Sequence, residues 1–175
     1  MMEFIQDRPN LEMLAIQDFS GANRMVAAGL GKCLSTLPKL KGLKLSARYL
    51  KGNSLSEVLS HIPKSLDALA IEMSLTPDDP SILIQLGPFL PRLRFLRGFF
   101  IHQITESRNP RSFDRATRLA LQLQKIEFVG VQDTKLSVKR GPGGVKFEPL
   151  NLKKVDPVIN WVLEWRSKDL DFVLG

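Results

Sequence analysis

The pattern L-x-x-L-x-L recurs along this chain, and it constrains the possible fold more than any other feature. In LKGLKL, the pattern narrows from a spacing of three, between Leu40 and Leu43, to a spacing of two, between Leu43 and Leu45. A spacing of two is the period of a β-strand. A surface helix would instead need apolar residues three and four apart over several turns. We therefore expect a strand here, with leucines in the core and lysines facing water. A return of the pattern at a fixed interval would indicate repeated strand and helix units.

Five segments match the pattern at nearly even intervals. They are LEMLAI from Leu11, LKGLKL from Leu40, LDALAI from Leu66, LRFLRG from Leu93, where Gly98 takes the last apolar place, and LQKIEF from Leu123. Their starts are 29, 26, 27 and 30 residues apart, and a proline precedes each of the first four. Chance supplies one or two such matches in a leucine-rich chain, so five matches at nearly even intervals indicate a repeat.

The segments between these strands carry helix signals. Ser54 and Glu57 form a capping box, in which each side chain bonds a free backbone N–H of the other residue. Asp79-Pro80 and Asn109-Pro110 are caps followed by a proline, which suits the first helical turn. Residues 22–37 predict a further helix, weakened by two glycines. The sequence thus predicts a strand and a helix in each repeat.

The carboxy-terminal part departs from the repeat. Alternating apolar residues on both sides of Gly-Pro-Gly-Gly predict a hairpin, with Pro142 and Gly143 in the middle of a type II turn. Asp156-Pro157 predicts a helix start, and the expected apolar stripe consists of Val158, Trp161, Val162 and Trp165. We expect a solenoid over residues 1–133, and a hairpin and helix over residues 134–175 that cap the last repeat.

The repeats resemble those of leucine-rich-repeat proteins with long repeats, similar to the ribonuclease-inhibitor type, and especially the degenerate repeats of fungal F-box proteins. The resemblance covers about residues 9–131. It implies an α/β solenoid of about five irregular strand-helix repeats, and substrate recognition for a ubiquitin ligase. No F-box segment is recognisable, so a ubiquitin-ligase adaptor is expected as a partner only if an F-box lies outside this chain. The short start before Leu11 predicts the carboxy-terminal part of a longer protein, or a gene model that begins late.

Composition indicates one folded domain inside the cell. The chain has 175 residues, 43% of them hydrophobic, which is enough apolar material for a packed core. It has no run of about 18 apolar residues and its acidic start lacks the layout of a secretion signal. Its one cysteine, Cys33, suits a reducing compartment. We expect a cytoplasmic or nuclear protein that does not enter a membrane.

The candidate catalytic residues all have simpler structural roles. His61 and His102 are far apart and lack neighbours at metal-ligand spacing. The pair Asp78-Asp79 suits a helix start, and Cys33 suits a buried position. The glycines of 141–144 lack the Lys-Ser/Thr that follows in a phosphate loop. The sequence therefore predicts no enzyme, no cofactor and no metal.

What remains is a binding surface for a protein partner. Residues between the core leucines should share the concave side: Met13, Ala15, Gln17, Gly42, Lys44, Ser46, Ala68, Ala70, Glu72, Phe95, Arg97, Phe99, Lys125, Glu127 and Val129. The candidate partner-binding residues are Phe95, Arg97 and Phe99, with Lys44, Glu72, Gln17, Lys125 and Glu127, because aromatic residues and arginine are enriched at hot spots. The fourth match is the loosest, so inward packing of Phe95 or Phe99 stays open.

The alternative is a nucleic-acid or anionic-surface binder, since the net charge is +7. Its cations would be Lys39, Lys41, Lys44, Arg48 and Lys51 with Arg92, Arg94 and Arg97. Eighteen acids are interspersed among the 25 bases, and no aromatic residues alternate with them to stack on bases. Protein binding is therefore the favoured function, and affinity that falls steeply with salt would favour the alternative.

Overall fold

One seven-stranded sheet organises the described part of the molecule. The computed structural model describes residues 8–16, 24–46, 52–73, 86–103, 112–131 and 134–164. The strands are β1 (Met13–Ile16), β2 (Gly42–Ser46), β3 (Ala68–Met73), β4 (Gly98–Gln103), β5 (Phe128–Val131), β6 (Thr134–Gly141) and β7 (Gly144–Pro149). They lie in the sheet in sequence order. β1 to β5 are parallel, whereas β6 and β7 continue the sheet antiparallel.

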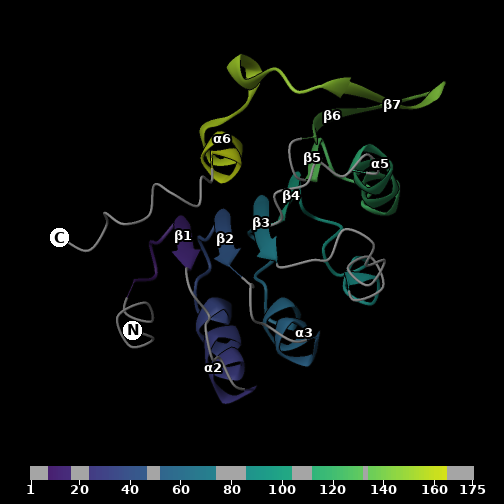
Figure 1. Ribbon diagram of the computed structural model, residues 1–175. Helices are drawn as coiled ribbons and strands as arrows, with labels where there is room; N and C mark the ends of the chain where they lie inside the picture. The colour runs from purple at the N-terminus through teal and green to yellow at the C-terminus, as the bar shows by residue number, and fades with distance from the viewer. Residues whose placement is uncertain are drawn as a thin grey trace.

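Helices cover both faces of this sheet. The four α-helices of the described residues are α2 (Arg24–Ser35), α3 (Gly52–Ser60), α5 (Ser112–Gln122) and α6 (Pro157–Leu163), and a 3-10 turn, η1, spans Leu152–Lys154. Figure 1 shows α2 and α3 below β1, β2 and β3, and α6 on the opposite side. We call the side of α2 and α3 the first face and the side of α6 the second face.

The expected solenoid of about five strand-helix repeats is wrong. The structure is a single mixed sheet with four described α-helices, and it ends in an antiparallel hairpin. In a solenoid each unit contacts only its neighbours in sequence. Here α6, from the end of the described chain, lies over β2, β3 and β4, so strands from distant segments share one covering helix.

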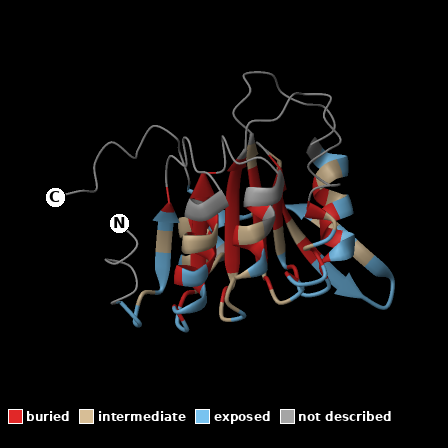
Figure 2. Ribbon diagram, turned by 90° about the horizontal axis from the view of Figure 1, so that it is seen from below, coloured by how far each residue is buried: buried red, intermediate tan, exposed pale blue. Residues whose placement is uncertain are grey.

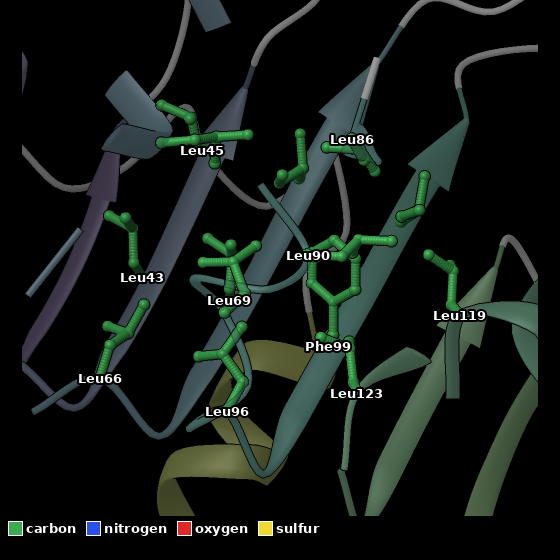
Figure 3. Packing of buried hydrophobic residues seen from close by; sticks show 14 of the residues in the cluster. Leu43, Leu45, Leu66, Leu69, Leu86, Leu90, Leu96, Phe99, Leu119 and Leu123 are labelled. Atoms are coloured by element: carbon green, nitrogen blue, oxygen red, sulfur yellow. The ribbon is translucent and has the colours of Figure 1, made fainter. Parts of the chain in front are cut away.

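The main core lies on the first face, beneath α2, α3 and α5. Because side chains alternate across a strand, residues such as Leu43 and Leu45 point to one side. Cross-strand register aligns Leu43 with Leu69, Leu69 with Phe99, and Phe99 with Val129. All four are fully buried, and Figure 3 shows three of them in one packed cluster. The predicted inward leucines of β2 and β3 are thus confirmed.

The fourth and fifth strands lie three residues later than the sequence predicted. Pairing aligns Phe99 with Leu69 and Ile101 with Ile71, so the fourth match begins at Leu96 instead of Leu93. The fifth match likewise begins at Ile126, not Leu123. Both the expected and the actual starting residues are buried, because Leu93 and Leu123, in the segments before the strands, are themselves part of the main core. Hydrophobicity alone could not separate the two registers of the fifth match, whereas in the fourth the later register fills all three apolar places and the earlier one ends on Gly98.

The carboxy-terminal hairpin is confirmed, with a different turn. β6 and β7 flank Pro142 and Gly143, and Gly141 pairs with Gly144. The positive φ of 101° belongs to Gly144, while a type II turn would require it at Gly143. Glycine tolerates this left-handed backbone because it has no Cβ. The hairpin extends the sheet beyond β5 instead of closing a last repeat.

α6 begins where the sequence predicted, but it packs on a different part of the molecule than expected. Asp156 is the N-cap, since its Oδ1 accepts the N–H of Ile159 at 3.0 Å, and Pro157 follows. The fully buried residues are Ile159, Val162 and Leu163, whereas Trp161 is half-buried. The expected stripe is confirmed for Val162, which is buried, and for Val158 and Trp161, which are partly buried and pack against the same cluster as Ile159. The surface that α6 covers differs from the expected one, because α6 packs on the sheet, across β2 to β4, and not on a last repeat. Trp165 lies outside the described residues.

Candidate functional site

The second face holds the part of the predicted binding surface that lies on β1, β2 and β3. Its members on β2, β3 and β4 are Gly42, Lys44, Ser46, Ala68, Ala70, Glu72, Gly98, Phe100 and His102. α6 covers much of it and forms a second apolar cluster. That cluster consists of Ala68, Ala70, Phe100, Ile159, Val162 and Leu163. The face is therefore occupied by the chain's own helix.

Small residues let α6 approach the sheet closely. Gly42, Ala68 and Gly98 stand side by side in register across three strands. A Cβ on Gly98 would lie 2.7 Å from Cδ1 of Ile159, a separation that real Cβ atoms do not show. A Cβ on Gly42 would lie 3.3 Å from the ring of Trp161. These glycines thus serve the contact with α6.

A row of alternating charges runs along the amino ends of the parallel strands. We call it the charge ladder, and it consists of Glu12, Lys41, Asp67, Arg97 and Glu127. In each neighbouring pair, the backbone N–H of the later residue donates to the carbonyl of the earlier one at 2.8 Å. The ladder places opposite charges next to each other across strands, an arrangement that stabilises sheet pairing. Lys41 accordingly bonds Glu12, with Nζ and Oε1 3.0 Å apart.

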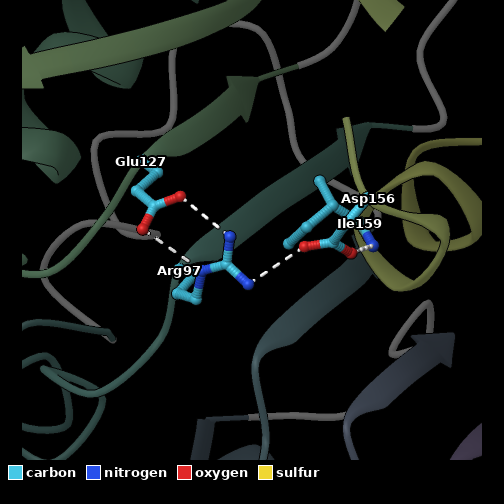
Figure 4. Close-up of polar contacts among 4 residues, drawn as sticks. All are labelled: Arg97, Glu127, Asp156 and Ile159. Atoms are coloured by element: carbon cyan, nitrogen blue, oxygen red, sulfur yellow. Dashed lines mark hydrogen bonds and ion pairs between the residues drawn. The ribbon is translucent and has the colours of Figure 1, made fainter. Parts of the chain in front are cut away.

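Arg97 connects the charge ladder to α6 (Figure 4). Its Nε and Nη2 donate to the two carboxylate oxygens of Glu127 at 3.2 and 3.0 Å. Its Nη1 donates to Oδ2 of Asp156 at 3.0 Å. The hydrogen bonds to Glu127 raise the pKa of Arg97, and the charges of Asp156 and Asp67 act in the same direction. One guanidinium therefore fixes the start of α6 to the amino end of β4, in the middle of the sheet.

Lys44 is a buried cation beneath α6. Its residue is 8% exposed, and its Nζ lies 4.1 Å from the ring centroid of Trp161. Burial lowers the pKa of Lys44, and the charge of Glu164 partly offsets this. Within the part of the chain that the structure describes, Nζ makes no hydrogen bond or ion pair. The cation is held by an aromatic face and a more distant carboxylate.

An apolar strip remains exposed beside α6. Met13 and Ala15 of β1 neighbour Gly42 and Lys44 in register, on the second face. Both are exposed, Met13 by 43%. Gly42 contacts Trp161, so the tryptophan lies on the β1 side of α6. Figure 2 shows the contrast between exposed β1 and the buried central strands. The edge of the sheet therefore presents apolar side chains to solvent.

The three favoured partner-binding residues lie in three different environments. Phe99 is fully buried in the main core, on the first face. Phe95 lies in the turn before β4, half-buried against the same core. Arg97 precedes β4 and belongs to the charge ladder. The three-residue shift of β4 explains why they do not share a surface, and it also puts Val129 in the core.

The remaining predicted residues are also dispersed. Lys44 and Glu72 lie on the second face and are 8% and 5% exposed. Lys125 is exposed in the turn before β5, and Glu127 bonds Arg97. Gln17 lies outside the described residues. Among the candidates that the structure describes, Arg97 and Glu127 are in direct side-chain contact.

Several cations of the basic alternative are already engaged within the protein. Lys39 donates to Oδ1 of Asn10 at 2.7 Å, and Lys41 and Arg97 have acidic partners in the charge ladder. Lys44 is buried, whereas Arg92 and Arg94 are exposed. Arg48 and Lys51 lie outside the described residues. The described cations therefore form no continuous basic surface along these segments.

The candidate catalytic groups occupy structural positions where the structure describes them. Cys33 is buried in α2, and burial raises the pKa of its thiol, which disfavours the reactive thiolate. His61 follows α3, with Nδ1 2.9 Å from the carbonyl of Glu57. His102 lies on β4 beside Glu72 in register. Among the described residues, no group of three or more His, Cys, Asp or Glu could hold a metal ion. Asp78 and Asp79 lie outside them.

Comparisons with known proteins supply no family. No protein-family model matches the chain, and a search of curated proteins finds no significant match. In the described residues, no helix has both the length and the apolar character needed to cross a membrane.

The sequence contained a signal for the charge ladder, but the wrong starts of the fourth and fifth matches hid it. The residue after the first leucine of each early match alternates in sign, through Glu12, Lys41 and Asp67. With the corrected starts the alternation continues through Arg97 and Glu127. By contrast, no local signal gives the destination of α6, because its contacts on β2 lie more than 100 residues away.

Proposed function

We propose that the chain is a non-enzymatic protein-binding module that adds an extended segment of a partner to the outer edge of β1. The observation that carries this proposal is the edge strand β1, whose second-face side chains, Met13 and Ala15, are exposed and apolar and lie near the half-buried Trp161. Met13 and Trp161 belong to residue types that are enriched at protein interfaces.

The backbone geometry of β1 supports strand addition. The carbonyl of Glu12 accepts the N–H of Gly42 at 3.0 Å, so it faces β2. Because hydrogen-bonding groups alternate in direction along a parallel strand, those of Met13 and Ala15 face the outer edge. Among the described residues, no strand pairs there. An exposed edge of this kind is a template for another strand.

The charge ladder gives the added strand an expected chemistry. Glu12 is the ladder's outermost member, with a side chain that is 52% exposed although it bonds Lys41. A parallel strand beside β1 would continue the alternation with Lys or Arg next to Glu12. Its apolar side chains would cover Met13 and the nearby face of Trp161. The partner segment is thus an extended, apolar stretch that carries one cation.

Differential affinity capture tests this function. Ala15→Pro removes an outward N–H from β1 and leaves the bonds between β1 and β2 in place, since proline is tolerated on edge strands. Leu121→Ser is the matched control, because Leu121 is also exposed, by 59%, but lies on α5. We expect the same partners with the unchanged chain and Leu121→Ser, and at least a tenfold loss with Ala15→Pro.

Equal recovery from all three chains would contradict strand addition at β1. Nucleic acid that is recovered equally from all three and released by salt would instead favour the basic-surface alternative. Circular dichroism of Ala15→Pro, unchanged from that of the parent chain, would confirm that lost capture does not reflect unfolding.

A further inference from the structure

The outer edge of β1 has the backbone geometry of an inner strand of the sheet. We infer that this edge accepts a partner strand that runs parallel to β1 and has a fixed order of side chains. The order is Lys or Arg beside Glu12, then any residue, an apolar residue, any residue and a second apolar residue. This direction and order rest on the strand addition proposed above, and a separate experiment tests them.

The same turn precedes each of the five parallel strands. In this turn, the residue before the charge ladder donates its backbone N–H to the carbonyl three residues earlier, at 3.0 to 3.2 Å. The five bonds run from Leu11 to Arg8, Leu40 to Leu37, Leu66 to Pro63, Leu96 to Leu93 and Ile126 to Leu123. β1 is therefore entered like an inner strand, although it lies at the edge of the sheet.

After the turn, two backbone donors point at one carbonyl of the preceding strand. In all four parallel pairs, a ladder residue and the residue after it both donate to the carbonyl of the preceding ladder residue, at 2.8 to 3.0 Å. Because Met13 is in register with Gly42, the corresponding donors of β1 are the N–H groups of Glu12 and Met13, on its outer side. In the part of the chain that the structure describes, no carbonyl accepts from either group.

Paired donors distinguish parallel from antiparallel pairing in this sheet. Where β6 runs antiparallel to β5, the carbonyl of the ladder residue Glu127 accepts one N–H, that of Val138, at 2.7 Å. The bonds of parallel strands are slanted, whereas those of antiparallel strands are perpendicular to the strands. The two donors of Glu12 and Met13 therefore select a strand that runs parallel to β1.

The apolar row of the first face is incomplete at β1. Leu14 continues the row of Leu43 and Leu69, yet it is half-buried, whereas those two leucines are fully buried. An apolar residue two places after the cation of a parallel strand would lie beside Leu14, and a second one would lie beside Ile16. β2 itself has this order, because Lys41 is followed by Gly42, Leu43, Lys44 and Leu45.

The two edges of the sheet differ in how they discourage strand addition. β7 ends on Pro149 and carries exposed Lys146 and Glu148, and proline and charged residues protect an edge strand from pairing. β1 has neither a proline nor a charged residue between its first and last residue. Glu12, just before β1, is half exposed and would attract a cation on the next strand and repel an acid.

The experiment titrates capped peptides into the full chain and follows its backbone amides by NMR. The parent peptide has the sequence of residues 38–47, which contains the β2 order, and a copy carries a spin label at its amino end. A Lys41→Glu peptide places an acid beside Glu12, and a Lys44→Glu peptide is the matched control of equal net charge. A peptide of reversed sequence keeps the composition and loses the order. A chain with Glu12→Lys and Lys41→Glu inverts the first two charges of the ladder and keeps their attraction.

We expect the parent peptide to shift the amides of Glu12 and Met13, and its spin label to broaden Glu12 more than Ile16. The Lys44→Glu peptide should bind equally well, whereas the Lys41→Glu and reversed peptides should bind about fivefold more weakly. The charge-inverted chain should prefer the Lys41→Glu peptide.

Three results would overturn the inference and leave strand addition standing, provided that Ala15→Pro still reduces partner capture. They are no binding of the parent peptide at millimolar concentration, equal binding of the parent and Lys41→Glu peptides, and stronger broadening of Ile16 than of Glu12. Peptide binding that Ala15→Pro does not weaken would contradict both proposals. Broadening of the Glu12 and Met13 amides that grows with chain concentration, without peptide, would identify a second copy of the chain as the occupant and would also overturn the inference.

Discussion

The two faces of the sheet are built from alternate residues of the same strands, yet they are organised differently. The first face repeats a large aliphatic or aromatic residue at each inward position, and three helices cover it. The second face combines small residues with buried polar ones, and one short helix covers its centre. The comparison teaches that a regular leucine pattern describes one face only. The residues between the leucines decide what the other face can bind.

The difference between the two faces is tested most directly by burying the same charged residue on each face and measuring the stability of both variants. Leu43 and Ile159 are both fully buried, the first in the main core and the second beneath α6. Leu43→Asp should unfold the chain, because a buried unpaired charge costs several kcal/mol against a total stability of about 5 to 15 kcal/mol. Ile159→Asp should leave a folded sheet. Urea unfolding followed by circular dichroism measures both.

Similar midpoints for the two variants would show that the faces form a single cooperative core. The matched substitution Leu121→Asp, at an exposed position of α5, controls for the added charge itself.

A smaller effect tests the register that assigns residues to the faces. Phe99→Ala should cost about 3 to 5 kcal/mol, the usual range for a buried phenylalanine. Phe95→Ala should cost about 1 kcal/mol, because Phe95 is only half-buried in the turn before β4. Thermal or urea unfolding of both variants gives the difference. Equal losses would mean that β4 does not present Phe99 to the main core.

The sequence was sufficient for the strands in which the complete pattern was chosen. In β2 and β3 leucines and an isoleucine fill the apolar places, and pairing confirms that register. Leu37 and Leu93 are both buried three residues before a complete pattern, and each offers an earlier frame that ends on a glycine. The prediction used the later frame for β2 and the earlier frame for β4, and pairing with β3 gives the later frame for both strands. Before β5 both frames are fully apolar, so pairing with β4 decides between them.

The binding surface was harder to predict than the strands, for a physical reason. Lys44 and Glu72 were correctly placed on the face opposite the leucines, since side chains alternate. Lys44 lies against Trp161 of α6, whose apolar residues could equally have covered the end of the sheet. The choice between those positions is made by contacts far apart in sequence, such as Asp156 with Arg97. Periodicity carries no information about such contacts.

Lys44 allows the second face to be tested through pH. Its pKa is lowered in the folded chain, so the unfolded chain binds this proton more strongly below the ordinary value of 10.5. The contribution of Lys44 to stability should therefore rise as pH increases towards 10.5. Lys44→Met should be neutral, or more stable by about 1 kcal/mol, at pH 7. It should also lose this pH dependence.

Urea midpoints of the unchanged chain and Lys44→Met between pH 7 and 10 provide the measurement. A difference between the two chains that stays constant with pH would mean that Lys44 is not desolvated beneath α6. Lys139→Met, at an exposed position of β6, is the control for loss of a lysine.

The smallest expected effect concerns the charge ladder, which borders both faces. Glu12→Gln removes the acid that bonds Lys41, where both side chains are about half exposed. Exposed ion pairs contribute about 0.2 to 1 kcal/mol and are screened by salt, so we expect a loss of about 0.3 kcal/mol in dilute buffer that vanishes near 1 M salt. Arg97→Gln should cost more, because Arg97 binds two acids and one of them begins α6. If the two variants are equally stable, Arg97 does not hold α6 to the sheet, and the second face is maintained by apolar contacts alone.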